Sequence, residues 1–203
     1  MEIVTVGGPA YVELDQPEGP AFLLVLTHGA GGGVDSPDLL AARQAALDLG
    51  GAVARVLQPY RVRGAAAPGS PGRQDAAWLE IIGALRPGFG AIPLVQGGRS
   101  NGARVACRTA QAAGARAVVA LAFPLHPPGH PEKSRAEELR AAGTDVLVVN
   151  GERDPFGLPD QADAARVVVL AGETHALSRD PAAVREAVRS WLATVLEAVA
   201  GKG

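Results

Sequence analysis

Apolar residues form two kinds of segment, which alternate along the chain from residue 21 onward. Short runs rich in β-branched residues predict buried strands, and segments with apolar residues three and four positions apart predict amphipathic helices. The predicted strands cover residues 2–6, 11–14, 21–27, 52–57, 92–95, 117–123, 145–150 and 166–170. The predicted helices cover residues 37–49, 75–85, 103–113, 134–142, 159–165 and 181–199.

This alternation predicts an α/β fold with a mostly parallel, doubly wound sheet covered by helices on both faces. The first two strands predict a short N-terminal hairpin. We find no internal repeat and no linker, so we predict a single domain over residues 1–203. The loop after the 117–123 strand is too short for a lid, so we predict a minimal fold without a cap domain.

The composition narrows the classes of partner. The 203 residues are 47% hydrophobic and 20% charged, which is typical of a globular protein. A net charge of −2 and an aromatic content of 4% argue against nucleic acid and anionic membranes as partners. No apolar run reaches the roughly 18 residues of a membrane span, and we recognise no secretory signal. We therefore predict a cytoplasmic protein.

The residues after the 92–95 strand carry the first candidate chemistry. Gly98-Arg99-Ser100-Asn101-Gly102 fits G-x-S-x-G, the nucleophile elbow, which requires a strand before it and a helix after it. A serine in such a turn is strained, and side chains two positions either side would collide, so glycine is needed there. Ser100 is therefore a candidate nucleophile. The alternative is a glycine-rich turn with a bystander serine.

Two further strands are followed by residues that could activate Ser100. Asp154 follows the 145–150 strand and His175 follows the 166–170 strand, giving the order Ser, acid, His. The carboxyl ends of parallel strands meet at one edge, so these side chains can converge there. A serine hydroxyl needs an imidazole to take its proton, and the imidazole needs a carboxylate to fix its tautomer. Glu152 is the alternative acid.

The glycine-rich turn after the 21–27 strand suggests a second part of the site. The main-chain N–H of Ala30 could complete an oxyanion hole with that of Asn101. His28 either orients this turn or acts as an alternative base, and a merely flexible loop is a further possibility. The stretch Gly29-x-Gly31-x-x-Val34 lacks the last residue of a dinucleotide fingerprint, and no lysine follows, so we predict no nucleotide cofactor.

Other side chains have less defined roles. An apolar wall for the substrate could come from Tyr60, Phe123, Leu125 and Phe156, each of which could equally belong to the core. His126 and His130 lie in a proline-rich loop that is either solvated or in contact with substrate. Cys107 is the single cysteine and is predicted to be buried and inert, and no cluster has the spacing of metal ligands, so we predict no metal.

These motifs resemble the α/β-hydrolase superfamily over nearly the whole chain, most closely its small capless members of the dienelactone-hydrolase kind. The more specific segments are similar to a group that includes a testis-expressed protein and a subunit of a histone-acetyltransferase complex. This resemblance implies Ser100, Asp154 and His175 as a triad. Asn101 departs from the pattern, which has a bulkier apolar residue. The segments are His28-Gly29-Ala30-Gly31-Gly32, Gly97-Gly98-Arg99-Ser100, Gly102-x-Arg104-Val105-Ala106 and Gly151-Glu152-Arg153-Asp154-Pro155-Phe156-Gly157.

The sequence thus predicts a serine hydrolase that cleaves a small-molecule ester or thioester through an acyl-enzyme. The site should be shallow and open, because no lid is expected. A dienelactone-type lactonase is a rival within the same class, but that chemistry often uses cysteine where this chain has Ser100. The alternative from another class is a catalytically idle interaction or scaffold module with the hydrolase fold. The physiological substrate and the oligomeric state are left open.

Overall fold

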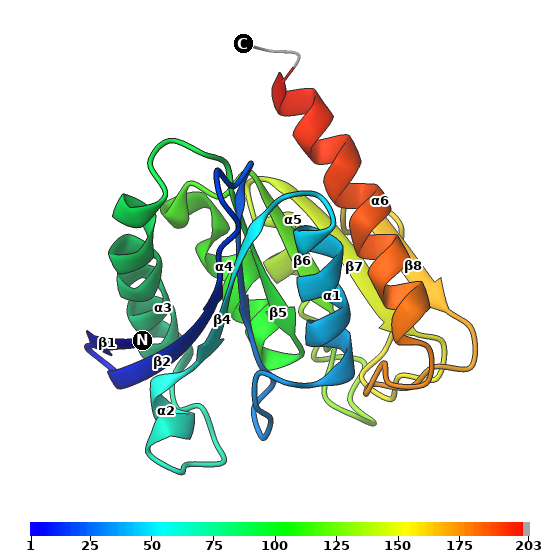
Figure 1. Cartoon of the computed structure of the whole chain (residues 1–203). Coiled ribbons are helices and arrows are strands. Elements are labelled where there is room, and N and C mark those ends of the chain that lie inside the picture. The colour runs from blue at the N-terminus through cyan, green and yellow to red at the C-terminus, as the bar shows by residue number, and fades with distance from the viewer. Residues whose placement is uncertain (201–203) are drawn as a thin grey trace.

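All the strands pair in one eight-stranded sheet, whose order along the sheet is β1-β2-β4-β3-β5-β6-β7-β8. The computed structural model describes residues 1–200, and the side chains of residues 1–198 (Figure 1). The pairs β1–β2 and β2–β4 are antiparallel, and all pairs from β4 to β8 are parallel. The strands are β1 (Glu2–Thr5), β2 (Gly8–Asp15), β3 (Leu23–Thr27), β4 (Ala52–Leu57), β5 (Leu94–Arg99), β6 (Ala117–Leu121), β7 (Asp145–Gly151) and β8 (Arg166–Leu170).

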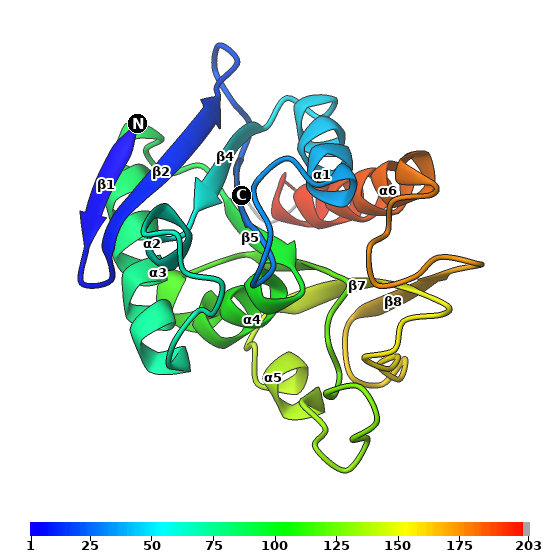
Figure 2. The same cartoon turned by 90° about the horizontal axis from the view of Figure 1, so that it is seen from below.

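Helices cover both faces of this sheet, so the predicted fold class is confirmed. They are α1 (Pro37–Leu47), α2 (Pro59–Val62), α3 (Pro71–Leu85), α4 (Asn101–Ala113), α5 (Ala136–Arg140) and α6 (Pro181–Ala200), with a 3₁₀ turn, η1 (Arg86–Gly88). Figure 2 shows α1 and α6 on one side of the sheet and α3, α4 and α5 on the other. No cap domain is present among the described residues. The predicted single domain over residues 1–203 stays a prediction, and its last three residues lie outside the described part.

The core explains why the central strands are apolar throughout. Along β3, Leu24 and Leu26 pack into the cluster beneath α1 and α6, whereas Leu23 and Val25 pack into the cluster beneath α3. Successive side chains of a strand point to opposite faces, so a sheet covered on both faces buries each of them. Burying each of these leucine side chains fully contributes about 1.5–3 kcal/mol to the stability of the fold. The parallel register of these strands brings their carboxyl ends to one edge of the sheet, where the candidate site residues follow.

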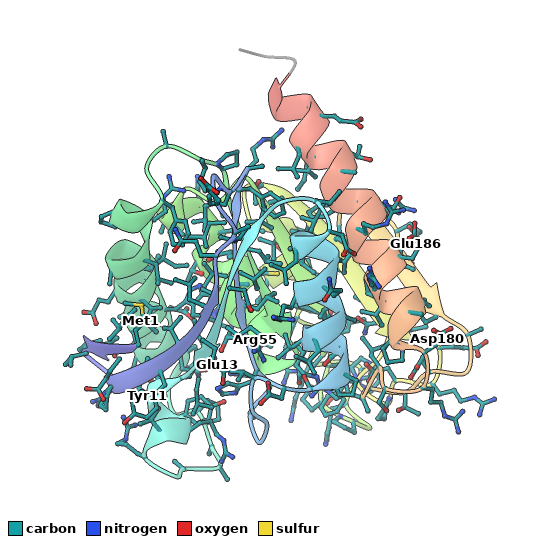
Figure 3. The ribbon with its side chains drawn as sticks, in the orientation of Figure 1. Met1, Tyr11, Glu13, Arg55, Asp180 and Glu186 are labelled. Atoms are coloured by element: carbon teal, nitrogen blue, oxygen red, sulfur yellow. The ribbon has the colours of Figure 1, made fainter. Side chains whose placement is uncertain are left out.

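An ion pair adds to the main-chain pairing of β2 with β4 that joins the N-terminal hairpin to the parallel sheet. Glu13 on β2 lies opposite Arg55 on β4, and their Oε2 and Nη2 atoms are 2.6 Å apart (Figure 3). Arg55 also donates to the Val34 main-chain oxygen (3.2 Å) and pairs with Asp35. Although Arg55 is mostly buried, its charge is therefore compensated where the antiparallel and parallel parts of the sheet meet.

Two boundaries near the predicted site differ from the sequence analysis. Strand β5 continues to Arg99 instead of ending at Val95, so the turn before α4 consists of little more than Ser100. The glycines allow this, because a Cβ built on Gly97 would lie 2.4 Å from the Val119 main-chain oxygen on β6. Strand β6 ends at Leu121, since Ala122 has φ +47°, outside the range of a strand.

Three other elements differ from prediction. A short helix, α2, lies at residues 59–62, where no helix is predicted, and α3 begins at Pro71 instead of Asp75. Proline is favoured in the first turn of a helix, and the Asp75 carboxylate is bound by Arg108 instead of capping a helix. The predicted 159–165 helix is wrong, because the Asp163 carboxylate accepts the N–H of Asp160 (2.9 Å) and closes a turn.

Candidate active site

Ser100 stands at the junction of β5 and α4 in the strained backbone conformation that an elbow requires. Its φ is +52° and its ψ is −115°, a conformation that costs a non-glycine residue roughly 1–3 kcal/mol. A Cβ built on Gly98 would lie 2.6 Å from the Thr27 oxygen, and one on Gly102 would lie 2.7 Å from the His28 oxygen. The steric reason given for both glycines is therefore confirmed.

Ser100, His175 and Asp154 form one hydrogen-bonded chain, although 75 residues separate the first two in sequence. His175 Nε2 lies 2.9 Å from Ser100 Oγ, and His175 Nδ1 lies 2.8 Å from Asp154 Oδ2. A carboxylate can only accept, so Nδ1 carries the proton of the neutral imidazole and Nε2 accepts from the Ser100 hydroxyl. This is the arrangement in which an imidazole can take the proton of a serine.

Asp154 is held in place by groups that the sequence analysis did not identify. Its side chain is fully buried, and its Oδ1 accepts the N–H of Phe156 (2.9 Å). Asn150 Nδ2 lies 3.4 Å from Asp154 Oδ2 and also donates to the Phe123 oxygen, while its own Oδ1 accepts the Phe123 N–H (2.8 Å). In the sequence, the sign of this role is the single amide residue, Asn150, that follows the apolar residues of β7. Glu152, the alternative acid, is exposed and accepts the Gly172 N–H instead.

The loop that carries His175 is fixed by a buried carboxylate. Glu173 is buried, and its Oε1 accepts the N–H groups of Arg179 (2.7 Å) and Asp180 (2.6 Å). Its main-chain oxygen accepts the N–H of Arg153 (2.8 Å). The loop is therefore tied both to the start of α6 and to the segment that carries Asp154.

The predicted oxyanion turn is held by donors to one carbonyl. The Gly29 oxygen accepts from His28 Nδ1 (2.8 Å), the Gly32 N–H (3.1 Å) and the Tyr60 hydroxyl (3.4 Å). A trans peptide points its N–H away from its carbonyl, so the Ala30 N–H is directed away from these groups. Among the described residues, neither this N–H nor that of Asn101 donates a hydrogen bond. Their role as oxyanion donors stays a prediction.

His28 orients this turn and is not available as a base. The side chain is buried, and its Nε2 accepts the main-chain N–H of Gln58 (3.0 Å) while its Nδ1 donates to the Gly29 oxygen. Both ring nitrogens are therefore occupied in the neutral form. Burial lowers the pKa of His28, which favours this neutral form further.

The four residues predicted as an apolar wall have different positions. Phe156 is partly exposed and stacks on the His175 ring, with centroids 4.3 Å apart, and Leu125 is also partly exposed. Tyr60 is buried edge-on against His28 and lines a hollow beside the β1–β2 turn. The assignment of Phe123 to the substrate wall is wrong, because its side chain is fully buried in the core cluster with residues of α4 and α5.

The remaining histidines and the cysteine do not join this chain of hydrogen bonds. The main-chain N–H of His126 donates to the Phe156 oxygen (2.9 Å), and a Cβ built on Gly157 would lie 2.3 Å from its Nε2. His130 is exposed beside Glu132. Cys107 is buried, and burial raises the pKa of its thiol. Within residues 1–198 we find no group of three potential metal-binding side chains.

None of the described helices combines the length and apolar character needed to cross a membrane.

Comparison with known proteins gives a family and a fold. A family model for an alpha/beta hydrolase domain matches residues 20–180. Est1E from Butyrivibrio proteoclasticus, solved with ferulic acid, superposes with a TM-score of 0.79 at 17% identity, over 97% of this chain and 99% of that chain. An alpha-beta serine hydrolase homologue from Coxiella burnetii gives 0.78 at 16% identity, over 95% and 96%. Dienelactone hydrolase from Anabaena variabilis gives 0.73 at 17% identity, over 96% and 95%. Comparison with curated protein sequences finds no match.

Proposed function

The chain belongs to the alpha/beta hydrolase family whose model matches residues 20–180, and on this premise we propose that it is a serine hydrolase of carboxylic esters or thioesters. The observation that carries the proposal is the continuous hydrogen-bonded chain from Ser100 through His175 to the buried Asp154. The strained backbone of Ser100 supports it, because such strain persists where the surrounding structure imposes it and is concentrated at functional sites.

In the first half-reaction, the Ser100 oxygen attacks the carbonyl carbon while His175 Nε2 takes the hydroxyl proton. The carbonyl oxygen becomes an oxyanion and accepts hydrogen bonds from the N–H groups of Ala30 and Asn101. The carbon–oxygen or carbon–sulfur bond then breaks. The leaving alcohol or thiol takes the proton from His175, and the acyl group remains on Ser100.

Water completes the cycle by the same route. His175 removes a proton from water as the water oxygen attacks the acyl carbon, and the proton then returns to the Ser100 oxygen as the acid is released. Asp154 remains ionised and stabilises the imidazolium in both steps. Its support from Phe156 and Asn150 keeps the carboxylate oriented toward His175.

The surroundings of the site favour small or protruding acyl groups. The His175 side chain is 20% exposed, and Phe156 and Leu125 beside it are also partly exposed, so the catalytic groups lie near the surface. Phe156 and Leu125 are the apolar side chains that we assign to the acyl group. Tyr60 supports the oxyanion turn through the Gly29 carbonyl.

A fluorophosphonate probe tests the proposal directly, because it reacts with an activated serine. We expect the folded wild type to be labelled, and Ser100→Ala to lose both labelling and the hydrolysis of short-chain esters. A panel of p-nitrophenyl esters and matched thioesters of increasing chain length would then define the acyl preference. A folded wild type that is neither labelled nor active would contradict the proposal and favour the interaction module.

A further inference from the structure

One guanidinium group connects three segments of the site. Arg99, the residue before Ser100, donates from Nε to Asp38 Oδ2 (2.7 Å) and from Nη2 to the main-chain oxygen of His175 (2.6 Å). A Cβ built on Gly29 would lie 3.3 Å from Arg99 Nη1, so the same group also packs against the oxyanion turn. Neither Arg99 nor Asp38 has a part in the proton transfers described above.

We propose that Arg99, anchored by Asp38, is a positioning residue that sets His175 at the distance from Ser100 that proton transfer requires. The inference rests on the proposed function. Two consecutive residues hold opposite ends of His175: Arg99 binds its main-chain oxygen, and Ser100 Oγ meets its Nε2. The last residue of β5 therefore fixes the His175 backbone in register with the nucleophile that follows it.

Asp38 gives Arg99 a rigid anchor. Its side chain is fully buried, and its other oxygen, Oδ1, accepts the N–H of Leu39 (2.9 Å). It lies in the first turn of α1, where the helix dipole favours a negative charge. Leu39 is itself buried in the core between the sheet, α1 and α6. The carboxylate thus has little freedom to move, and it directs the guanidinium toward the His175 loop.

The shape of arginine suits this role. The guanidinium is a planar fork whose Nε and Nη groups donate in fixed and different directions, so one side chain can serve Asp38 and the His175 carbonyl together. A lysine ammonium retains the charge, but it has no rigid fork that fixes two partners. Asp38 balances the positive charge, so the arginine places no uncompensated cation beside the imidazole.

His175 needs such a contact because its backbone lies in a turn outside any helix or strand. Within the described part of the chain, Arg99 is the only donor to its main-chain oxygen. Asp154 orients the ring from the side chain, but it does not fix the height of the backbone above β5. A displacement of about 1 Å in a catalytic group can lower a rate about 100-fold.

A paired substitution tests the proposal without leaving a buried charge. Asp38→Leu with Arg99→Met removes the ion pair while keeping similar volume. We expect kcat for a short-chain ester to fall about 10- to 100-fold with KM little changed, and fluorophosphonate labelling to slow equally. The single variant Arg99→Lys should have a kcat between those of the double variant and the wild type. Arg43→Gln, which removes another α1 ion pair, is the matched control and should retain full activity.

Proton NMR of the His175 Nδ1–H, which binds Asp154, gives a second readout that does not depend on turnover. We expect this low-field resonance to be lost or broadened in the folded double variant and retained in Arg43→Gln. A double variant that keeps both the wild-type labelling rate and an unchanged resonance would overturn the inference. If the wild type hydrolyses nothing, the proposed function fails. A lost resonance in the variant would still support Arg99 as the residue that positions the imidazole.

Discussion

Gly151 at the end of β7 and Thr174 in the loop before His175 lie so close that a Cβ built on Gly151 would be 2.5 Å from the Thr174 main-chain oxygen. The neighbouring Glu173 oxygen would lie 2.6 Å from the same atom. Backbone atoms cannot rotate away as a flexible side chain can. The absence of a side chain at residue 151 therefore lets the His175 loop settle against the strand that leads to Asp154.

Gly151→Ala should consequently push this loop outward. We expect kcat/KM for a short-chain ester to fall about 100-fold, because a displacement of about 1 Å separates the imidazole from Ser100. Steady-state kinetics would measure the loss, with circular dichroism to establish folding. Gly83→Ala on α3 is a suitable control, since a Cβ there meets no atom within 4 Å. An alanine variant at 151 with wild-type kinetics would show that the loop tolerates the shift.

Phe123→Ala should reduce stability and leave substrate binding nearly unchanged. Its ring is fully buried among residues of α4, α5 and β7, so truncation creates a cavity and costs about 3–5 kcal/mol of unfolding free energy. Urea denaturation measures this cost, and KM for a short-chain ester should stay within about twofold of wild type. Phe156→Ala is the contrasting variant. Its partly exposed ring stacks on His175, so we expect KM to rise in this variant. A KM that rises only in Phe123→Ala would contradict these assignments.

Asn150→Ala should lower both stability and the rate of acylation. The substitution removes the acceptor of the buried Phe123 N–H and the amide beside Asp154, and it costs about 1–3 kcal/mol for the unsatisfied group. Chemical denaturation would measure the loss of stability, and the rate of fluorophosphonate labelling would report the loss of carboxylate orientation. Labelling at the wild-type rate in a folded variant would mean that the Phe156 N–H alone orients Asp154.

His28 should make the fold more sensitive to acid. Burial lowers its pKa in the folded protein below the ordinary value of 6.5, so the unfolded chain binds a proton first as the pH falls. The stability that His28 contributes is therefore fully present above pH 6.5 and is lost as the pH drops through the folded-state pKa. Urea midpoints at pH 7.5 and 5 measure the loss, which should be smaller in His28→Gln. An equal loss in both proteins would exclude His28 as the source.

The order of strands and helices could be predicted from the sequence because each element carries its own local pattern. The candidate site could also be assembled, since Ser100, Asp154 and His175 each follow an apolar strand and the ends of parallel strands meet at one edge. The glycines at 98 and 102 added a steric reason that the structure confirms. The predicted likeness to the testis-expressed group stays a prediction.

The contacts that support the site could not be predicted, because each depends on which distant segments meet. Nothing local reveals that Arg99 reaches Asp38, or that Gln58 donates to His28. The start of α3 and the turn at 159–165 were missed for the same reason. The sequence places Asp75 at the start of a helix and Asp163 within one. In the structure Arg108 binds the Asp75 carboxylate four residues into α3, and the Asp163 carboxylate accepts the Asp160 N–H in a turn. Phe123 could not be placed from the sequence, because an apolar side chain is equally compatible with a substrate-contacting wall and with the buried core.

Strands β3 and β5 are neighbours in the sheet, and the chain continues from them in opposite directions, from β3 to β4 and from β5 to β6. The helices that follow them, α1 and α4, consequently pack on opposite faces of the sheet, which makes this the switch in strand order where sheets of this kind bind ligands. The turn carrying Ala30 and the elbow carrying Ser100 lie side by side at this switch, since a Cβ built on Gly29 would lie 3.3 Å from the Ser100 Cβ. Connectivity alone therefore brings together the two turns that the proposed reaction needs, although 70 positions separate Ala30 from Ser100 in the sequence.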